Sequence, residues 1–282
     1  MKPKIKNYYN KNEIELADIA RKLRALAIKS VHSAGSGHLG GSLSAADIIS
    51  CLYFDEMNLN PSKPMDRKRD RFILSKGHSC PILYSALAHK GFFNREELLG
   101  LRHINRLLQG HPDIKIPGVE FPSGSLGNGL PAAIGMAQES KEKKLFFRTY
   151  VLLGDGDMQE GSTDEALRIL GFIKYSNVVA ILDANKRQGD DKVENVLNYL
   201  PKLASRIRSY GWLCLEINGH HIGQILNAFK TAREEHDKPT FIIAHTVKGK
   251  GVSYMEDVQK WHGSLAPTNE ELKIALGELG EK

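Results

Sequence analysis

Two apolar runs that both end in polar residues most constrain how this chain can fold. Residues 150–153 are apolar and lead into Gly-Asp-Gly at 154–156, and residues 178–182 lead into Asp-Ala-Asn at 183–185. A helical pattern lies between the two runs, so the segment predicts a strand–helix–strand unit. In sheets built from such units, ligands bind beyond the carboxyl ends of the strands. We therefore expect Asp155 and Asn185 to meet at one edge of a sheet.

These two side chains are candidate metal ligands. Carboxylate and amide oxygens are hard ligands, and Mg²⁺ usually keeps its other positions for phosphate and water. Gly154 and Gly156 let the backbone approach a phosphate closely, and the helix that follows offers its N-terminus to the anion. Gly-Asp-Gly alone is more often a tight turn, and it is the Asn at the end of the next strand that favours a metal site.

Short apolar runs alternate with helical patterns along the rest of the chain. Helices are expected over residues 12–34, 44–57, 80–90, 130–141, 193–210, 221–235 and 268–279, and further strands over residues 71–74, 212–217 and 240–246. Residues 33–41 are too rich in glycine to suggest a helix, and Ser44/Asp47 and Ser162/Glu165 have the spacing of capping boxes. The alternation predicts an α/β fold, a doubly wound, mostly parallel sheet with helices on both faces, in a single domain over residues 1–282.

Composition excludes several classes of protein. The chain has 282 residues, of which 41% are hydrophobic and 26% charged, as in ordinary soluble domains. No apolar run approaches the roughly 18 residues of a membrane span. The basic N-terminus lacks the apolar stretch of a secretory signal. Three scattered cysteines fit neither disulfide nor zinc spacing, so we expect a cytoplasmic protein.

A net charge of +6 favours anionic partners. The densest basic segment, residues 63–71, is interrupted by Asp66 and Asp70, which is typical of a solvated loop. Aromatic residues do not alternate with the basic ones, and no RNA-binding signature is present. We therefore expect small anionic substrates and no nucleic acid.

Four histidines lie next to a glycine in expected loops: His38, His78, His111 and His262. A glycine neighbour lets a ring project into a cleft without crowding, and imidazole is suited to proton transfer near neutral pH. A single such histidine is more often a structural hydrogen-bonding residue. Four in the same setting, without cysteines, favour proton handling around an anion over a zinc site. The other seven histidines, His220 and His221 among them, are expected to be structural.

A further glycine-rich loop, residues 124–129, precedes the expected helix at 130–141. It could lie along a flat ligand or simply form a turn. It is not a phosphate-binding Walker A loop, because no Gly-Lys-Ser/Thr follows.

Taken together, these motifs resemble the transketolase family, and specifically the half that binds the diphosphate of thiamine diphosphate. Gly-Asp-Gly followed about 30 residues later by Asn is the cofactor motif of that family. Here it is accompanied, in the family's order, by SGHLGG, DRFILSKGH, GHPD, GSLGNG, VKGKG and WHG. The resemblance extends over roughly residues 16–267.

The resemblance implies a role for each matching residue. Mg²⁺ would be held by Asp155, Asn185 and the backbone carbonyl of Arg187. The residues that would contact the cofactor are His78, Gly124, Ser125, Leu126, Gly154, Asp155, Gly156, Asn185, Lys248 and His262. The residues that would face the substrate and transfer protons are His38, His111 and His262. Glu160 and Glu165 match glutamates at the family's dimer interface, although helix-capping carboxylates are the alternative.

Three departures from the family pattern stand out. Ser125 replaces the usual Pro, and Lys-Arg-Gln-Gly at 186–189 differs from the common Asn-Gly-Ile-Ser-Ile. The chain also ends about 20 residues after His262, where single-chain transketolases continue into a pyrimidine-binding domain. The resemblance therefore implies a C-terminal partner subunit that carries this domain, in a heterotetramer.

The reaction implied is transfer of a two-carbon ketol group from a ketose or its phosphate to an aldose or its phosphate, with activity only in the presence of the partner. Two alternatives remain open at this point. A related two-component enzyme could transfer an acyl group from a 2-oxo acid, or the chain could be a transketolase-like subunit without catalytic function.

Overall fold

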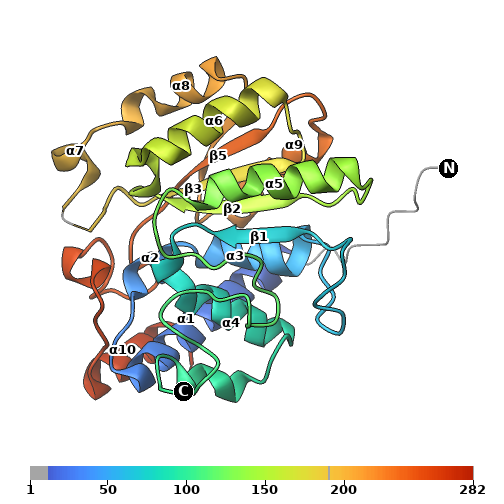
Figure 1. The fold of residues 1–282 in the computed structure, drawn as a ribbon. Coiled ribbons are helices and arrows are strands. Elements are labelled where there is room, and N and C mark those ends of the chain that lie inside the picture. Colours follow the sequence, from blue (N-terminus) through green and yellow to red (C-terminus); the bar gives the residue numbers. More distant parts are fainter. Residues whose placement is uncertain (1–11, 190, 282) are drawn as a thin grey trace.

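A parallel five-stranded sheet forms the centre of the fold, with strand order β1-β2-β3-β5-β4 (Figure 1). The computed structural model describes residues 12–189 and 191–281. The strands are β1 (Arg71–Leu74), β2 (Thr149–Gly154), β3 (Val178–Ala184), β4 (Leu213–Asn218) and β5 (Thr240–His245). Every neighbouring pair of strands is parallel, which confirms the predicted sheet and the α/β class.

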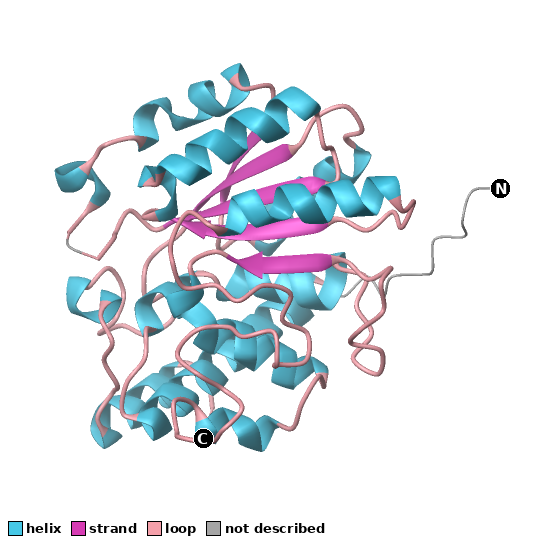
Figure 2. Cartoon of the chain, viewed as in Figure 1, coloured by secondary structure: helices cyan, strands magenta, loops and turns pink. Residues whose placement is uncertain are grey.

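Helices cover both faces of the sheet, as Figure 2 shows. They are α1 (Glu13–Ala34), α2 (Leu39–Ser44), α3 (Ala46–Cys51), α4 (Cys80–Lys90), α5 (Gly129–Glu142), α6 (Gly161–Ile173), α7 (Val193–Val196), α8 (Leu203–Ser209), α9 (Ile222–Glu234) and α10 (Asn269–Glu278). The side chains of β2 alternate between two apolar cores. Tyr150 and Leu152 pack in a core with α1, α3, α4 and α9, whereas Val151 and Leu153 pack in a core with α5, α6 and α8. Both faces of the central strands are therefore apolar, as a parallel sheet requires.

The first helix shows how local sequence sets the ends of an element. The Asn12 side chain accepts a hydrogen bond from the Glu15 N–H and caps α1. Gly35, at φ +66°, ends the helix in the left-handed conformation that glycine adopts without strain. Among the described residues, no helix is long and apolar enough to cross a membrane.

Some predictions of local structure were wrong. Residues 39–41 belong to helix α2, although their glycines suggested a loop. The helix needs these glycines because a Cβ on Gly40 would lie 2.6 Å from the carbonyl oxygen of Trp261. The segment 193–210 is broken into α7, a 3₁₀ turn containing Pro201, and α8.

Neither predicted capping box forms. Helices α3 and α6 lack a side-chain cap, and Ser44 and Ser162 instead make tertiary hydrogen bonds. The capping box in the described part of the chain is at α10, where Thr268 and Glu271 bond each other's backbone N–H groups.

Candidate functional site

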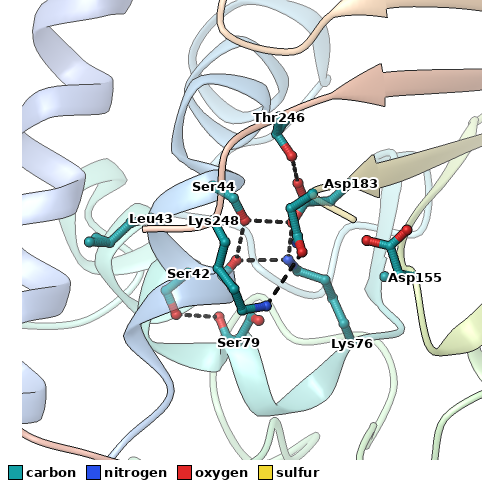
Figure 3. Close-up of polar contacts among 12 residues, drawn as sticks. Ser42, Leu43, Ser44, Lys76, Ser79, Asp155, Asp183, Thr246 and Lys248 are labelled. Atoms are coloured by element: carbon teal, nitrogen blue, oxygen red, sulfur yellow. Dashed lines mark hydrogen bonds and ion pairs between the residues drawn. The ribbon is translucent and has the colours of Figure 1, made fainter. Parts of the chain in front are cut away.

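The carboxyl ends of β1, β2, β3 and β5 meet at one edge of the sheet and supply the polar side chains of a pocket (Figure 3). Gly154 of β2 lies in register with Asp183 of β3, so the residues that follow each strand are neighbours. The pocket is lined by Gly41, Lys76, His78, Leu126, Gly154, Asp155, Gly156, Asp157, Asn185, Arg187, Gln188, Gly189, Lys248 and His262. The expectation that Asp155 and Asn185 share one edge is confirmed.

Asp155 is a buried carboxylate that faces this pocket. Its Oδ1 accepts a hydrogen bond from the Tyr199 hydroxyl at 2.8 Å, and its Oδ2 accepts one from the Lys186 N–H at 2.9 Å. Burial raises the pKa of Asp155 to about 6, because its few donors only partly replace water. A divalent cation beside the carboxylate would favour its charged form.

Asn185 presents its amide in one orientation. Its Nδ2 donates to Asp183 at 3.0 Å, while its Oδ1 accepts from the Arg187 N–H at 3.2 Å and lies 3.4 Å from the ammonium of Lys248. The oxygen end of the amide is therefore on the pocket side, where cationic and N–H groups gather.

Asp183 is the fully buried centre of a polar network below the pocket (Figure 3). It accepts hydrogen bonds from Ser44, Lys76 and Thr246 as well as from Asn185. Burial alone would raise its pKa, but the ammonium of Lys76 and the hydroxyl donors outweigh burial and hold it below its ordinary value. Sequence reasoning assigned no role to Asp183 or Lys76, although both lie inside the quoted motifs.

Two buried ammonium groups line the pocket. Lys76 and Lys248 are each only 2% exposed. Burial, together with the charge of Lys76, lowers the pKa of Lys248 from 10.5 to about 8. Two buried cations close together are stabilised by a ligand that carries more than one negative charge.

Three of the four predicted histidines cluster at the pocket, and His78 and His262 line it. The His78 ring lies between those of His38 and His262, at centroid distances of 5.3 and 5.8 Å. Burial, followed by nearby cations, lowers the pKa of His38 to about 4 and that of His262 to about 3. These rings are therefore neutral near pH 7 and can both donate and accept hydrogen bonds.

His111 and the glycine loop lie farther out. His111 is exposed, and a Cβ on Gly124 would lie 3.4 Å from its ring. Of the three predicted loop residues, Leu126 lines the pocket, whereas Gly124 and Ser125 are exposed. Sequence reasoning missed Arg102, whose guanidinium bonds Ser36 and Ser264 and lies 3.5 Å from the His38 ring.

Glu160 and Glu165 are both exposed. Glu160 occupies the N-cap position of α6, but its side chain makes no capping hydrogen bond. The helix-cap alternative therefore gains no support from Glu160, and the dimer-interface role stays a prediction.

The residues present fit a magnesium-bound diphosphate. Oxygen donors from Asp155 and Asn185 suit Mg²⁺, and two lysines suit the anion. Within residues 12–189 and 191–281, no group of three or more His, Cys, Asp and Glu side chains is arranged to hold a metal. In the same ranges, Nδ1 of His262, a residue that lines the pocket, is buried without a hydrogen-bond partner and remains free to bond a ligand.

A parallel sheet that presents these groups at its carboxyl edge defines a cofactor-binding α/β domain. The model of the family described as "Transketolase, thiamine diphosphate binding domain" matches residues 16–281. The chain therefore belongs to the transketolase family, which confirms the resemblance and the transketolase-type enzyme class.

Relatives and solved structures agree with this assignment. The chain is 41% identical to an apulose-4-phosphate transketolase subunit of Phocaeicola vulgatus, over 93% of each protein. It is 36% identical to the 6-deoxy-6-sulfo-D-fructose transketolase subunit SqwG of a Clostridium species, over 96% of this chain and 98% of that protein. The crystal structure of transketolase from Campylobacter jejuni superposes with a TM-score of 0.90 and 34% identity, over 96% of this chain.

The chain covers only part of the longer relatives. It is 41% identical to human transketolase over 90% of its own length, but this match spans 40% of the human protein. The match to the Campylobacter jejuni enzyme spans 44% of that chain. The matched segment thus corresponds to less than half of these transketolases.

Proposed function

We propose that this chain is the subunit of a two-component transketolase that anchors the diphosphate end of thiamine diphosphate, with residues 1–282 as one cofactor-binding domain. The observation that carries the proposal is the pocket in which Asp155 and Asn185 lie beside the buried ammonium groups of Lys76 and Lys248. The two relatives that match over nearly their whole length are both named as transketolase subunits, which supports the need for a partner.

In this proposal, Mg²⁺ is held by the side chains of Asp155 and Asn185 and by the backbone carbonyl of Arg187. The diphosphate is held by Lys76, Lys248 and the neighbouring pocket residues, namely His78, Gly154, Gly156 and His262. The loop of Gly124, Ser125 and Leu126 lies along the cofactor. Leu126 supports this placement because a Cβ on Gly156 would lie 2.9 Å from it, so the two loops are in contact.

Thiamine diphosphate, when bound, supplies a thiazolium ring that stabilises a carbanion. The residues of this chain bind and orient the cofactor and the sugar, and they exchange protons with the sugar. His38, His111 and His262 face the substrate. Because their pKa values are lowered, their rings are neutral and available to accept a proton from a hydroxyl or to donate a hydrogen bond to one.

The partner is a C-terminal transketolase subunit that carries the pyrimidine-binding domain, and two copies of each chain form a heterotetramer. Together they transfer a two-carbon ketol group from a ketose phosphate to an aldose phosphate. The two subunit relatives are named for unusual sugars, so a ketose outside the common pentose phosphates is an equally suitable donor.

The test is a turnover assay with this chain alone, the partner alone, and both together, with Mg²⁺ and thiamine diphosphate in each mixture. We expect ketol transfer from ketose phosphates only when both subunits are present. Turnover of pyruvate but not of any ketose would replace the proposal with acyl transfer. Failure of the complex to bind thiamine diphosphate in calorimetry would leave a subunit without catalytic function.

A further inference from the structure

We propose that Asp183 is a positioning residue that fixes the amide of Asn185, so that the oxygen of this amide and not its NH₂ group faces the metal. The proposal rests on the proposed function, because the metal belongs to that function. Asp183 is not itself a ligand, since its carboxylate lies below the pocket and is occupied by other groups.

The first step is the charge and bonding of Asp183. A carboxylate only accepts hydrogen bonds, and each side chain around this one is a donor. Ser44 and Asn185 donate to Oδ2 at 2.6 and 3.0 Å, Lys76 also donates to Oδ2, and Thr246 donates to Oδ1. With no exposed surface, Asp183 has no water to replace any of these donors.

The second step is the orientation of the Asn185 amide. Its NH₂ group donates to Asp183, and its oxygen faces the Arg187 N–H and the Lys248 ammonium. An amide turned by 180° would place its oxygen against the carboxylate and its NH₂ group against two other donors. Every contact would become repulsive, so Asp183 selects one of two sterically equivalent orientations. That orientation is the one that offers Mg²⁺ an oxygen.

The third step is the acceptor that the Asn185 NH₂ group needs. An amide at position 183 could keep this acceptor, with its oxygen where Ser44, Lys76 and Asn185 converge and its NH₂ group toward Thr246, whose hydroxyl can rotate to accept. A leucine has a similar shape but no acceptor. With Asp183→Leu, the Asn185 NH₂ group therefore loses its buried partner, and the amide is no longer held with its oxygen toward the metal.

The experiment measures Mn²⁺ affinity, by electron paramagnetic resonance, in the complex of this chain with its partner subunit and thiamine diphosphate. We expect Asp183→Leu to lower the affinity about 10- to 100-fold, the usual effect of losing a group that orients a metal ligand. The double variant Asp183→Leu/Asn185→Asp leaves the net charge of the site unchanged. We expect it to restore the affinity to within about threefold of wild type, because a carboxylate at 185 presents oxygen in either orientation.

Thr246→Val is the matched control, because it removes one donor from Asp183 on the oxygen that Asn185 does not use. We expect its Mn²⁺ affinity to stay within about threefold of wild type. Thermal unfolding of each metal-free variant shows which of them fold. If Asp183→Leu fails to fold, the double variant still decides, because a folded double variant with wild-type affinity supports the proposal.

Unchanged affinity in Asp183→Leu would overturn the proposal, and so would a folded double variant that does not regain affinity. The second result would show that Asp183 acts through Lys76 and not through Asn185. A wild-type complex that binds thiamine diphosphate without any metal dependence would instead overturn the metal assignment of the proposed function. The two failures are therefore distinguishable.

Discussion

Replacing Lys248 with Met should stabilise the protein and weaken cofactor binding at the same time. The pKa of Lys248 is lowered from 10.5 to about 8, and at 1.36 kcal/mol per unit this corresponds to a cost of roughly 3 kcal/mol for the buried charge. Because the folded pKa lies below the unfolded one, the cost applies in full below about pH 8 and disappears as the pH rises toward 10.5. Loss of the hydrogen bond to Asn185 offsets about 1 kcal/mol of the gain.

We therefore expect the free energy of unfolding of the Lys248→Met variant at pH 7, without cofactor, to rise by roughly 2 kcal/mol, which raises Tm by about 3–4 °C. A hydrogen bond to a charged group contributes about 1.5–3 kcal/mol, so thiamine diphosphate affinity in the complex should fall about 10- to 100-fold. Calorimetry measures both quantities.

Lys250 provides the matched control, because it lies in the same loop, is 37% exposed at its side chain and pairs with Glu256. Lys250→Met should change neither quantity appreciably. A Lys248→Met variant that is less stable than wild type and binds the cofactor as tightly would refute the reasoning, since it would place Lys248 in a structural role.

Three further predictions follow from particular contacts. Asp155→Ala should abolish Mg²⁺-dependent binding of thiamine diphosphate to the complex, and unchanged affinity in calorimetry would contradict the metal assignment. Burial and nearby ammonium groups lower the pKa of His262 to about 3, so its ring should stay neutral in ¹⁵N NMR down to about pH 5, whereas titration near pH 6.5 would show an open, solvated ring. Gly171→Ala should destabilise the fold by about 1–3 kcal/mol in urea unfolding, because its Cβ would lie 1.9 Å from the carbonyl oxygen of Tyr210. Gly135→Ala, with open space around its Cβ, should be neutral or slightly stabilising, and equal effects of the two substitutions would contradict the packing argument.

The architecture could be predicted from sequence because its signals are local and repeated. The apolar runs that became β2 and β3 are buried along their whole length, and such runs separated by helical patterns are typical of parallel sheets. Parallel strands place their carboxyl ends at one edge, so the meeting of Asp155 and Asn185 followed from connectivity alone.

The helices that were missed or wrongly bounded depend on tertiary contacts. Helix α2 contains Gly40 because the backbone of Trp261 passes too close for a side chain, and spacing along the chain carries no sign of that neighbour. Ser44 has the spacing of a helix cap, but Asp183, which is 139 residues away in sequence, competes successfully for its hydroxyl. Local helix propensity does not show whether a serine hydroxyl will cap its own helix or bond a buried carboxylate that is distant in sequence.

The polar network below the pocket was also beyond prediction from sequence. Lys76 follows β1 and Asp183 lies in β3, and only the arrangement of the sheet brings them together. Asp183 follows an apolar run, as Asp155 does, yet it lies below the pocket and not in its lining. A pattern of residue types identifies the edge of the sheet, whereas the depth of each side chain depends on packing.

An anomalous difference map from crystals of the complex, grown with Mn²⁺ and thiamine diphosphate, tests the central claim most directly. We expect one strong manganese peak coordinated by Oδ of Asp155, Oδ1 of Asn185 and the carbonyl oxygen of Arg187, with the cofactor diphosphate completing the coordination near Lys248. A cofactor bound without a metal at this edge of the sheet, or a manganese peak elsewhere, would contradict the account.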